Sequence, residues 1–150
     1  MKEQDRIISI SPFSIEAYDQ VYALWRRCAG VGLSGSDNLQ NITSYLERNP
    51  SMSFVAGSDK RLVGAILCGH DGRRGYIHHL AVDENFRRHG IGRRLVERAL
   101  SALREEGIQK CHLFIFYKNE PGIAFWQKIG WTFRQDIRVM STQIIEGNNS

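Results

Sequence analysis

Residues 75–92 read GYIHHLAVDENFRRHGIG, and the rest of the chain is organised around them. Residues 76–82 are aromatic, β-branched and aliphatic, and a glycine and a polar run bound them, which is typical of a strand. From Ile91 the apolar residues recur at helical spacing until Gly107, where a helix is expected to end. The segment therefore predicts a strand, a basic glycine loop and a helix.

The loop between this strand and helix is suited to an anion. Gly90 and Gly92 leave the first N–H groups of the helix accessible, and these donors lie at the positive end of the helix dipole. Four arginines crowd the same place: Arg87, Arg88, Arg93 and Arg94. A pyrophosphate or phosphate ester matches so many donors better than a single carboxylate. The alternative, for a Gly-x-Gly pair on its own, is a solvated basic helix start.

Two common phosphate loops do not fit. No Lys-Ser or Lys-Thr follows Gly92, so the loop is not a Walker A motif. A Rossmann fingerprint begins directly after its strand, whereas seven residues separate Val82 from Gly90, and Leu95 occupies the place of the third glycine.

What remains is Arg87-x-x-Gly90-x-Gly92 after a Leu-Ala-Val strand. This pattern resembles motif A of the Gcn5-related N-acetyltransferase (GNAT) family, whose members bind acetyl-CoA. Asn119 followed by residues 124–131, AFWQKIGW, resembles the end of the family's motif B, an Asn and then Phe-Tyr-x-x-x-Gly-Phe. Trp126 stands in the place of that tyrosine.

The resemblance implies a GNAT fold of the α/β (α+β) class. Its central sheet is mixed, mostly antiparallel, splayed between the fourth and fifth strands and flanked by about four helices. The periodicity predicts the same order, β-α-α-β-β-β-α-β-α-β-β, with about seven strands. The strands are expected at residues 7–10, 52–56, 62–68, 76–82, 110–116, 131–133 and 137–144. One domain is expected over residues 1–150, with a disordered tail at about 146–150.

Composition argues against several other classes of protein. The formal charge is only +4 and the positive residues cluster at the glycine loop, which favours an anionic cofactor over nucleic acid. Cys28, Cys68 and Cys111 form no Cys-x-x-Cys spacing, so reduced thiols of a cytoplasmic protein are expected. No signal-like apolar region or membrane-length segment is present in the sequence. His70 beside Asp71 is too little for a metal site.

Cofactor contacts follow from the resemblance, with acetyl-CoA as the co-substrate. The strand end is expected to bind the pantetheine arm and the thioester, and the arginine and glycine loop the pyrophosphate. Asn119 and two aromatic residues are expected to flank the arm. The full expected set is Leu80, Ala81, Val82, Arg87, Arg88, His89, Gly90, Ile91, Gly92, Arg93, Asn119, Phe125 and Trp126.

Catalysis in the family is a direct attack of an amine on the thioester. His78 is the expected base, because related enzymes carry theirs near the positions of Tyr76 and His78, and because a neutral imidazole accepts a proton at physiological pH. The alternative is a histidine hydrogen-bonded in a half-buried sheet. A β-bulge after His78 would favour His79 instead. An indole cannot donate a proton to the leaving thiolate, so Tyr117 is the nearest substitute for the missing tyrosine.

The expected function is therefore an acetyl-CoA-dependent N-acetyltransferase acting on a primary amine of a small molecule, peptide or protein. A non-catalytic acyl-CoA sensor and another kind of nucleotide-binding protein are the alternatives. An acyl-cysteine route lacks a paired histidine. An aromatic acceptor pocket is suggested by four residues that serve equally well as core: Tyr22, Trp25, Tyr45 and Trp131. A homodimer through the closing strands is also compatible with the sequence.

Overall fold

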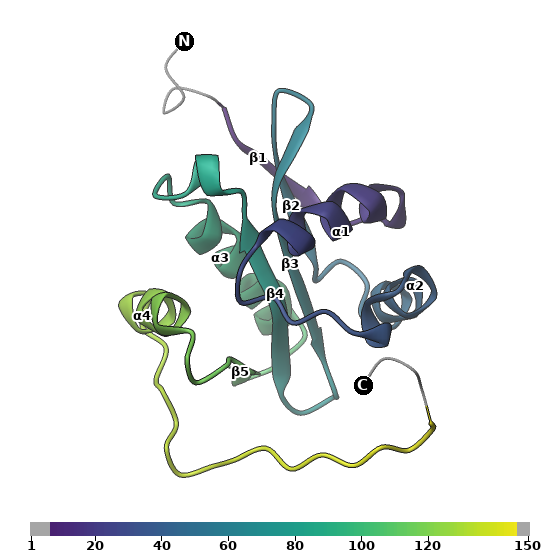
Figure 1. Cartoon of the computed structure of the whole chain (residues 1–150), viewed down its shortest axis with the longest axis vertical. Helices are drawn as coiled ribbons and strands as arrows, with labels where there is room; N and C mark the ends of the chain where they lie inside the picture. Colours follow the sequence, from purple (N-terminus) through teal and green to yellow (C-terminus); the bar gives the residue numbers. More distant parts are fainter. Residues whose placement is uncertain (1–6, 147–150) are drawn as a thin grey trace.

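The computed structural model describes residues 7–146. Within that range the chain forms one five-stranded sheet and four α-helices (Figure 1). The strands are β1 (Ser9–Pro12), β2 (Phe54–Ser58), β3 (Arg61–His70), β4 (Gly75–Val82) and β5 (Cys111–Leu113). The helices are α1 (Tyr18–Arg27), α2 (Leu39–Arg48), α3 (Ile91–Glu105) and α4 (Glu120–Lys128).

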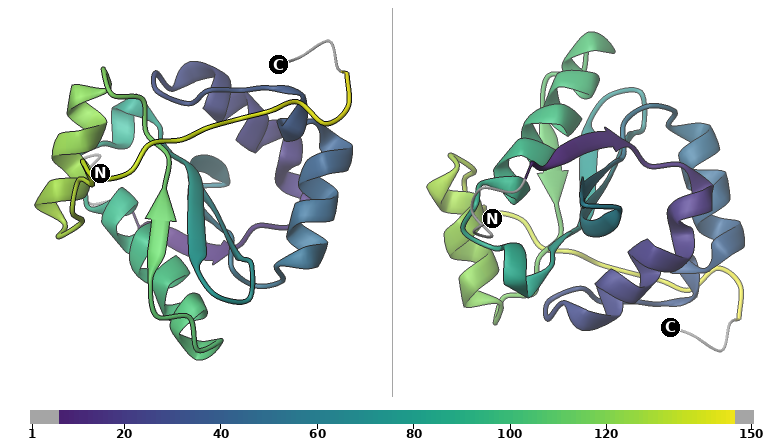
Figure 2. Two further views of the ribbon diagram at one scale, coloured as in Figure 1. Left: turned by 90° about the horizontal axis from the view of Figure 1, so that it is seen from below. Right: turned by 90° about the horizontal axis from the view of Figure 1, so that it is seen from above.

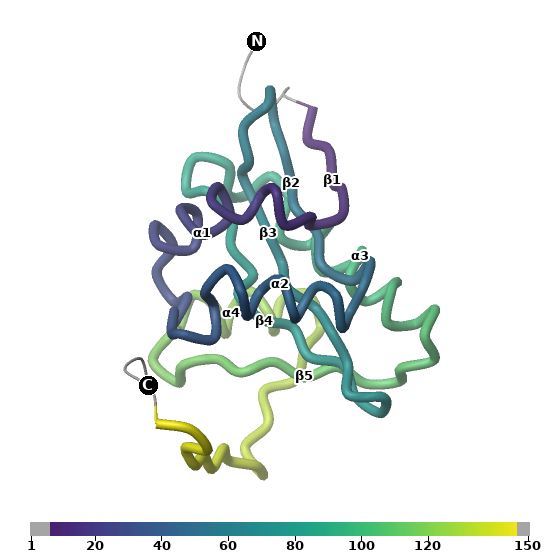
Figure 3. Tube along the Cα trace, turned by 90° about the vertical axis from the view of Figure 1, so that its right-hand side faces the viewer, coloured from purple at the N-terminus to yellow at the C-terminus, as the bar shows by residue number. Residues whose placement is uncertain are grey.

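The strands lie in the order β1-β2-β3-β4-β5. Every neighbouring pair is antiparallel except β4 and β5, which are parallel, so the expected mixed and mostly antiparallel sheet is confirmed. Helices α1 and α2 lie on one face of the sheet, and α3 and α4 on the other (Figures 1 and 3).

Each face of the sheet has its own apolar core. Val63 and Ile66 of β3 pack with Leu95 of α3 in one cluster, whereas Leu24 and Trp25 of α1 belong to the other. These five side chains are at most 1% exposed, and burying such side chains stabilises the fold by roughly 1.5–3 kcal/mol each. The two cores clamp the central strands, which therefore hold the site described below in place.

The predicted end of the central helix is confirmed, and so is the β2–β3 hairpin, although its turn is shorter than predicted. Gly107, at φ +79°, follows α3 and donates its N–H to the carbonyl of Arg104. Asp59 and Lys60 both have positive φ, which is the geometry of a two-residue type I′ turn.

Strand β4 contains a bulge in the middle of its pairing with β3. Ala65 pairs with Ala81 and Leu67 with His78, so two residues of β4, His79 and Leu80, lie opposite one residue of β3. His79 has φ +50°, a rare value for a residue with a side chain. The extra residue reverses the alternation of side chains along the strand at this point.

The prediction of about seven strands is wrong, because the two closing strands do not form. Residues 131–146 run out from α4 in an extended path past the lower end of the sheet (Figures 1 and 2). Ile137, Val139, Met140 and Ile144 are 55–96% exposed. The apolar pattern is there, but within residues 7–146 this segment pairs with no strand of the sheet, and these side chains stay largely exposed. The expected disordered tail falls mostly outside the described residues.

Several predicted strand boundaries also moved, those of β1 and β5 most clearly. Strand β5 ends at Leu113 rather than at residue 116, because β4 diverges beyond that point and offers no partner. Strand β1 begins at Ser9 and includes Pro12, which an edge strand tolerates. Among the described residues, no helix is long and apolar enough to cross a membrane.

Candidate active site

A cleft opens where β4 and β5 part. The two strands pair only over residues 75–77 of β4 and 111–113 of β5, although β4 continues to Val82. The gap is part of a cleft of about 1430 Å³, lined also by the start of α3, by α4 and by the loop after α1. Among the described residues, backbone groups of residues 78–82 on the β5 side of β4 therefore lack a strand partner, and those that no side chain binds are open to a ligand.

The N-terminus of α3 lies at this cleft. Gly90 precedes the helix with φ +77° and no side chain caps the first turn, so the N–H groups of Ile91, Gly92 and Arg93 are open to an anion. A Cβ on Gly92 would lie 3.2 Å from the ring of Phe125, so glycine permits the close packing of α3 and α4. Arg87, Arg88 and Arg93 line the same part of the cleft.

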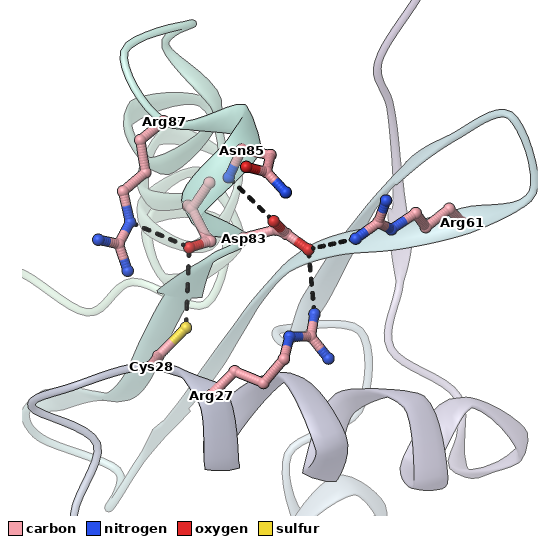
Figure 4. A network of polar contacts seen from close by, with 7 residues as sticks. Arg27, Cys28, Arg61, Asp83, Asn85 and Arg87 are labelled. Atoms are coloured by element: carbon pink, nitrogen blue, oxygen red, sulfur yellow. Dashed lines mark hydrogen bonds and ion pairs between the residues drawn. The ribbon is translucent and has the colours of Figure 1, made fainter.

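Polar contacts fix the end of β4 (Figure 4). The carbonyl of Val82 accepts the Nε–H of Arg87 at 3.2 Å and lies 3.7 Å from the Sγ of Cys28. The next residue, Asp83, is 4% exposed. Its Oδ2 lies 3.0 Å from Nη2 of Arg27 and 3.0 Å from Nη2 of Arg61. The cleft wall is thereby tied to α1 and to β3.

Asp83 is ionised in this network. Burial acts to raise its pKa, but the N–H of Asn85 and the two guanidinium groups outweigh burial and hold the pKa below its usual value. A carboxylate with a depressed pKa stabilises the fold at pH values above its unfolded pKa, and this stabilisation is lost as the pH falls through the folded pKa.

Asp83→Asn is therefore expected to lower the free energy of unfolding by about 1–3 kcal/mol at pH 7. The difference in the free energy of unfolding between variant and wild type should shrink below about pH 4, where the Asp83 carboxyl group of the unfolded chain takes up a proton. Urea unfolding across the pH range measures both. The matched control is Asp136→Asn, which breaks an exposed pair with Arg134 and should leave stability unchanged. Equal effects of the two substitutions would contradict the importance of the network.

Both histidines of β4 line the cleft. Because of the bulge, His78 and His79 lie on the face that carries α1 and α2: the ring of His78 is 6.1 Å from that of Tyr45, and the ring of His79 is 5.0 Å from that of Trp25. The bulge thus brings His79 to the cleft without removing His78 from it.

The two histidines differ in their hydrogen bonds. Nε2 of His79 donates to Oδ1 of Asp37 at 2.8 Å, and that carboxylate is only 6% exposed. Burial acts to raise the pKa of Asp37, but its hydrogen bonds with His79 and with the N–H of Ser34 dominate and lower it. His78 has no hydrogen bond to its ring within the described residues, and burial, aided by the nearby His79, lowers its pKa. His78 is therefore a neutral imidazole with a free lone pair.

The far side of the cleft is formed by residues after β5. Asn119 caps α4 by accepting the N–H of Gly122 at 3.0 Å, and Phe114 and Phe116 line the opening. The glycine-rich loop after α1 reaches across to this side: a Cβ on Gly30 would lie 2.7 Å from Asn119, and one on Gly32 would lie 2.8 Å from Phe116. The loop thus covers part of the cleft.

Most of the expected site residues come together. His78 and all the expected cofactor residues except His89 line the cleft. Tyr76 does not, because its ring packs on His112 and Phe114, and Tyr117 is 77% exposed outside it.

The residues suggested as an acceptor pocket serve instead as core or packing. Trp25 is 1% exposed, and Tyr22, Tyr45 and Trp131 pack against the two cores rather than line the cleft. Phe114 and Phe116 were missed. In the sequence they are visible only as two apolar residues at alternate positions, and β5 loses its pairing with β4 just before them.

Burial makes the three cysteines poor nucleophiles. Burial raises the pKa of Cys68 and of Cys111 to about 12, and burial also raises that of Cys28. All three thiols stay protonated at neutral pH. Among the described residues, no group of three or more metal-ligating side chains comes together.

Comparison with known proteins gives a consistent result. The profile of the acetyltransferase (GNAT) family matches residues 18–131. An acetyltransferase of Photorhabdus laumondii is 30% identical over 139 residues, 92% of this chain and 96% of the relative. The crystal structure of Ard1 from Thermoplasma volcanium has a TM-score of 0.75 and 25% identity, and the match covers 85% of this chain and 84% of that chain. The PaiA N-acetyltransferase of Thermoplasma acidophilum, solved in complex with coenzyme A, has the same fold, with a TM-score of 0.75 at 20% identity over 85% of this chain and 91% of that chain.

Proposed function

Because the chain belongs to the acetyltransferase (GNAT) family, we propose that it transfers the acetyl group of acetyl-CoA directly to a primary amine. The observation that carries the proposal is the parting of β4 and β5 beside the uncapped start of α3. A diphosphate and a thioester arm need these two features next to each other. The structures of coenzyme A complexes among the neighbours support the same cofactor.

Acetyl-CoA is held in three parts. The N–H groups of residues 91–93 and the arginines of the loop bind the diphosphate, where charge-assisted hydrogen bonds are strongest. The free edge of β4 at residues 80–82 binds the pantetheine arm and directs an N–H toward the thioester oxygen. Phe125 and Trp126 pack beside the arm.

His78 is the general base. The amine nitrogen attacks the carbonyl carbon, the carbon–sulfur bond breaks, and the proton lost by the amine passes to the free ring nitrogen of His78. Its lowered pKa keeps the ring neutral before the reaction. His79 is assigned a positioning role: its Nε2–H donates to Asp37, and this bond helps to hold the bulge that places His78.

The leaving thiolate needs no tyrosine. A thiol of pKa about 8.5 is an adequate leaving group, and water at the open cleft protonates it. Trp126 has no acidic proton, and Tyr117 lies on the outer surface. Tyr117→Phe should therefore leave the rate unchanged.

The test is to incubate the protein with acetyl-CoA and a panel of primary amines while following the release of free thiol and the acetylated product by mass spectrometry. Turnover of an amine supports the proposal. Binding of acetyl-CoA without turnover of any amine between pH 6 and 9 would instead support an acyl-CoA sensor. Competition by ATP stronger than by coenzyme A would contradict both.

Three further properties remain proposals. The chain acts as a single domain over residues 1–150, and it works in the cytoplasm, where three free thiols stay reduced. A homodimer through the exposed apolar side chains of residues 137–145 is a prediction that light scattering tests.

A further inference from the structure

The part of the cleft beside the proposed base is aromatic. Phe114 and Phe116 follow β5 at alternate positions, and each is 62% exposed. The ring of His78 stacks with that of Phe114, with centroids 6.3 Å apart and planes at 29°. We refer to His78, Phe114 and Phe116 as the aromatic wall. Since His78 must touch the attacking amine, the rest of the acceptor lies against this wall.

The aromatic wall is supported from behind. The ring of Tyr76 stacks on Phe114 at 6.3 Å with planes at 16°, and Gly32 approaches the ring of Phe116 so closely that no side chain fits between them. The rings are thus held in place while still exposed. Covering these rings with an apolar body removes apolar surface from water, and little side-chain entropy is lost because the rings are already held.

The charges of the cleft are all of one sign. Its lining contains no aspartate or glutamate among the described residues, whereas Arg87, Arg88, Arg93 and Lys128 are cationic. Asp37 is the carboxylate behind the wall, but it is buried and bound to His79. The loop arginines are taken up by the diphosphate of acetyl-CoA, and a second ammonium group beside the aromatic wall would find no free side-chain carboxylate in the described lining to pair with.

We propose that the acceptor is a monoamine with an aromatic or apolar body and no second cationic group, which lies against the aromatic wall. The inference rests on the proposed acetyltransferase function and names its substrate class. We expect kcat/KM to be higher for such amines than for polyamines, aminoglycosides and lysine-rich peptides. Each of these brings several cationic groups into a cleft whose described lining has no carboxylate.

Matched pairs of amines test the charge and the wall separately. Hexylamine and 1,6-diaminohexane differ by one ammonium group, and kcat/KM should be at least ten-fold higher for hexylamine. 2-Phenylethylamine and ethylamine share the reacting group, and kcat/KM should be at least ten-fold higher for the aromatic amine. Equal or reversed preferences in either pair overturn the inference.

Two substitutions at one exposed position sharpen the test. Phe114→Ala should raise the KM for 2-phenylethylamine about ten-fold and leave the KM for acetyl-CoA unchanged. Phe114→Glu should raise kcat/KM for 1,6-diaminohexane above that of the wild type, because it supplies the missing carboxylate; this gain cannot come from misfolding. Phe133→Ala, an exposed ring outside the cleft lining, is the control and should change neither constant.

The outcomes distinguish a wrong substrate class from a wrong acetyltransferase function. Turnover that favours the diamine or kanamycin overturns the substrate class and leaves the acetyltransferase function standing. Turnover of no amine, with acetyl-CoA bound, overturns the function and the substrate class with it.

Discussion

Gly90→Val should raise the dissociation constant of coenzyme A about 10- to 100-fold. Gly90 has φ +77°, a conformation that costs a residue with a side chain about 1–3 kcal/mol, and a β-branched residue pays the most. The loop is expected to relax away from this conformation and to withdraw the N–H groups of the first turn of α3 from the diphosphate. Isothermal titration with coenzyme A measures the effect.

The chain provides a matched control in Gly107. It follows the other end of the same helix at φ +79°, and a Cβ at either glycine would meet no atom within 4 Å. Gly107→Val should lower thermal stability about as much as Gly90→Val does, without any change in coenzyme A affinity. If both variants bind coenzyme A like the wild type, the diphosphate lies elsewhere.

His78→Ala should lower kcat/KM about 10²- to 10⁴-fold at neutral pH, which is the usual contribution of a general base. The lowered pKa of His78 determines in which pH range the rate should fall. In both proteins the rate should rise with pH as the amine loses its proton in solution. In the wild type an additional acid limb should appear below about pH 6.5, the ordinary pKa of histidine, where His78 itself becomes protonated. In the variant that additional limb is absent.

His112→Ala is the matched control for this experiment. His112 is a half-buried histidine of the neighbouring strand that does not line the cleft, so its removal should leave the shape of the pH profile intact. Asp37→Asn tests the role of the second histidine: a positioning group should lower kcat several-fold without moving the acid limb. A loss in His78→Ala that is the same at every pH would indicate packing rather than proton transfer.

The features that could be predicted from the sequence are those that short-range interactions determine. The helix that begins at Ile91 and stops before Gly107, the hairpin and the glycine loop follow from short-range patterns of apolar spacing and positive φ, and they are confirmed. The residues expected to bind the cofactor share these elements, so nearly all of them line one cleft.

Long-range pairing decided what the sequence could not predict. The apolar alternation of residues 137–144 satisfies a strand pattern, yet a strand exists only when a neighbour accepts its hydrogen bonds. The hydrogen bond of His79 with Asp37 joins residues 42 positions apart, and no spacing rule predicts it. The same holds for Phe114 and Phe116, whose role follows from the loss of a strand partner.

The bulge at His79 affects both the opening between β4 and β5 and the orientation of the two histidines. One surplus residue in β4 accompanies the loss of pairing with β5 and turns two consecutive imidazoles toward the same side. Deleting that single residue would restore a regular ladder, and would at once narrow the slot for the thioester and rotate a histidine into the opposite core. Insertions and deletions here should therefore be far less tolerated than substitutions, and any redesign of this enzyme must preserve the length of β4 before it alters the chemistry.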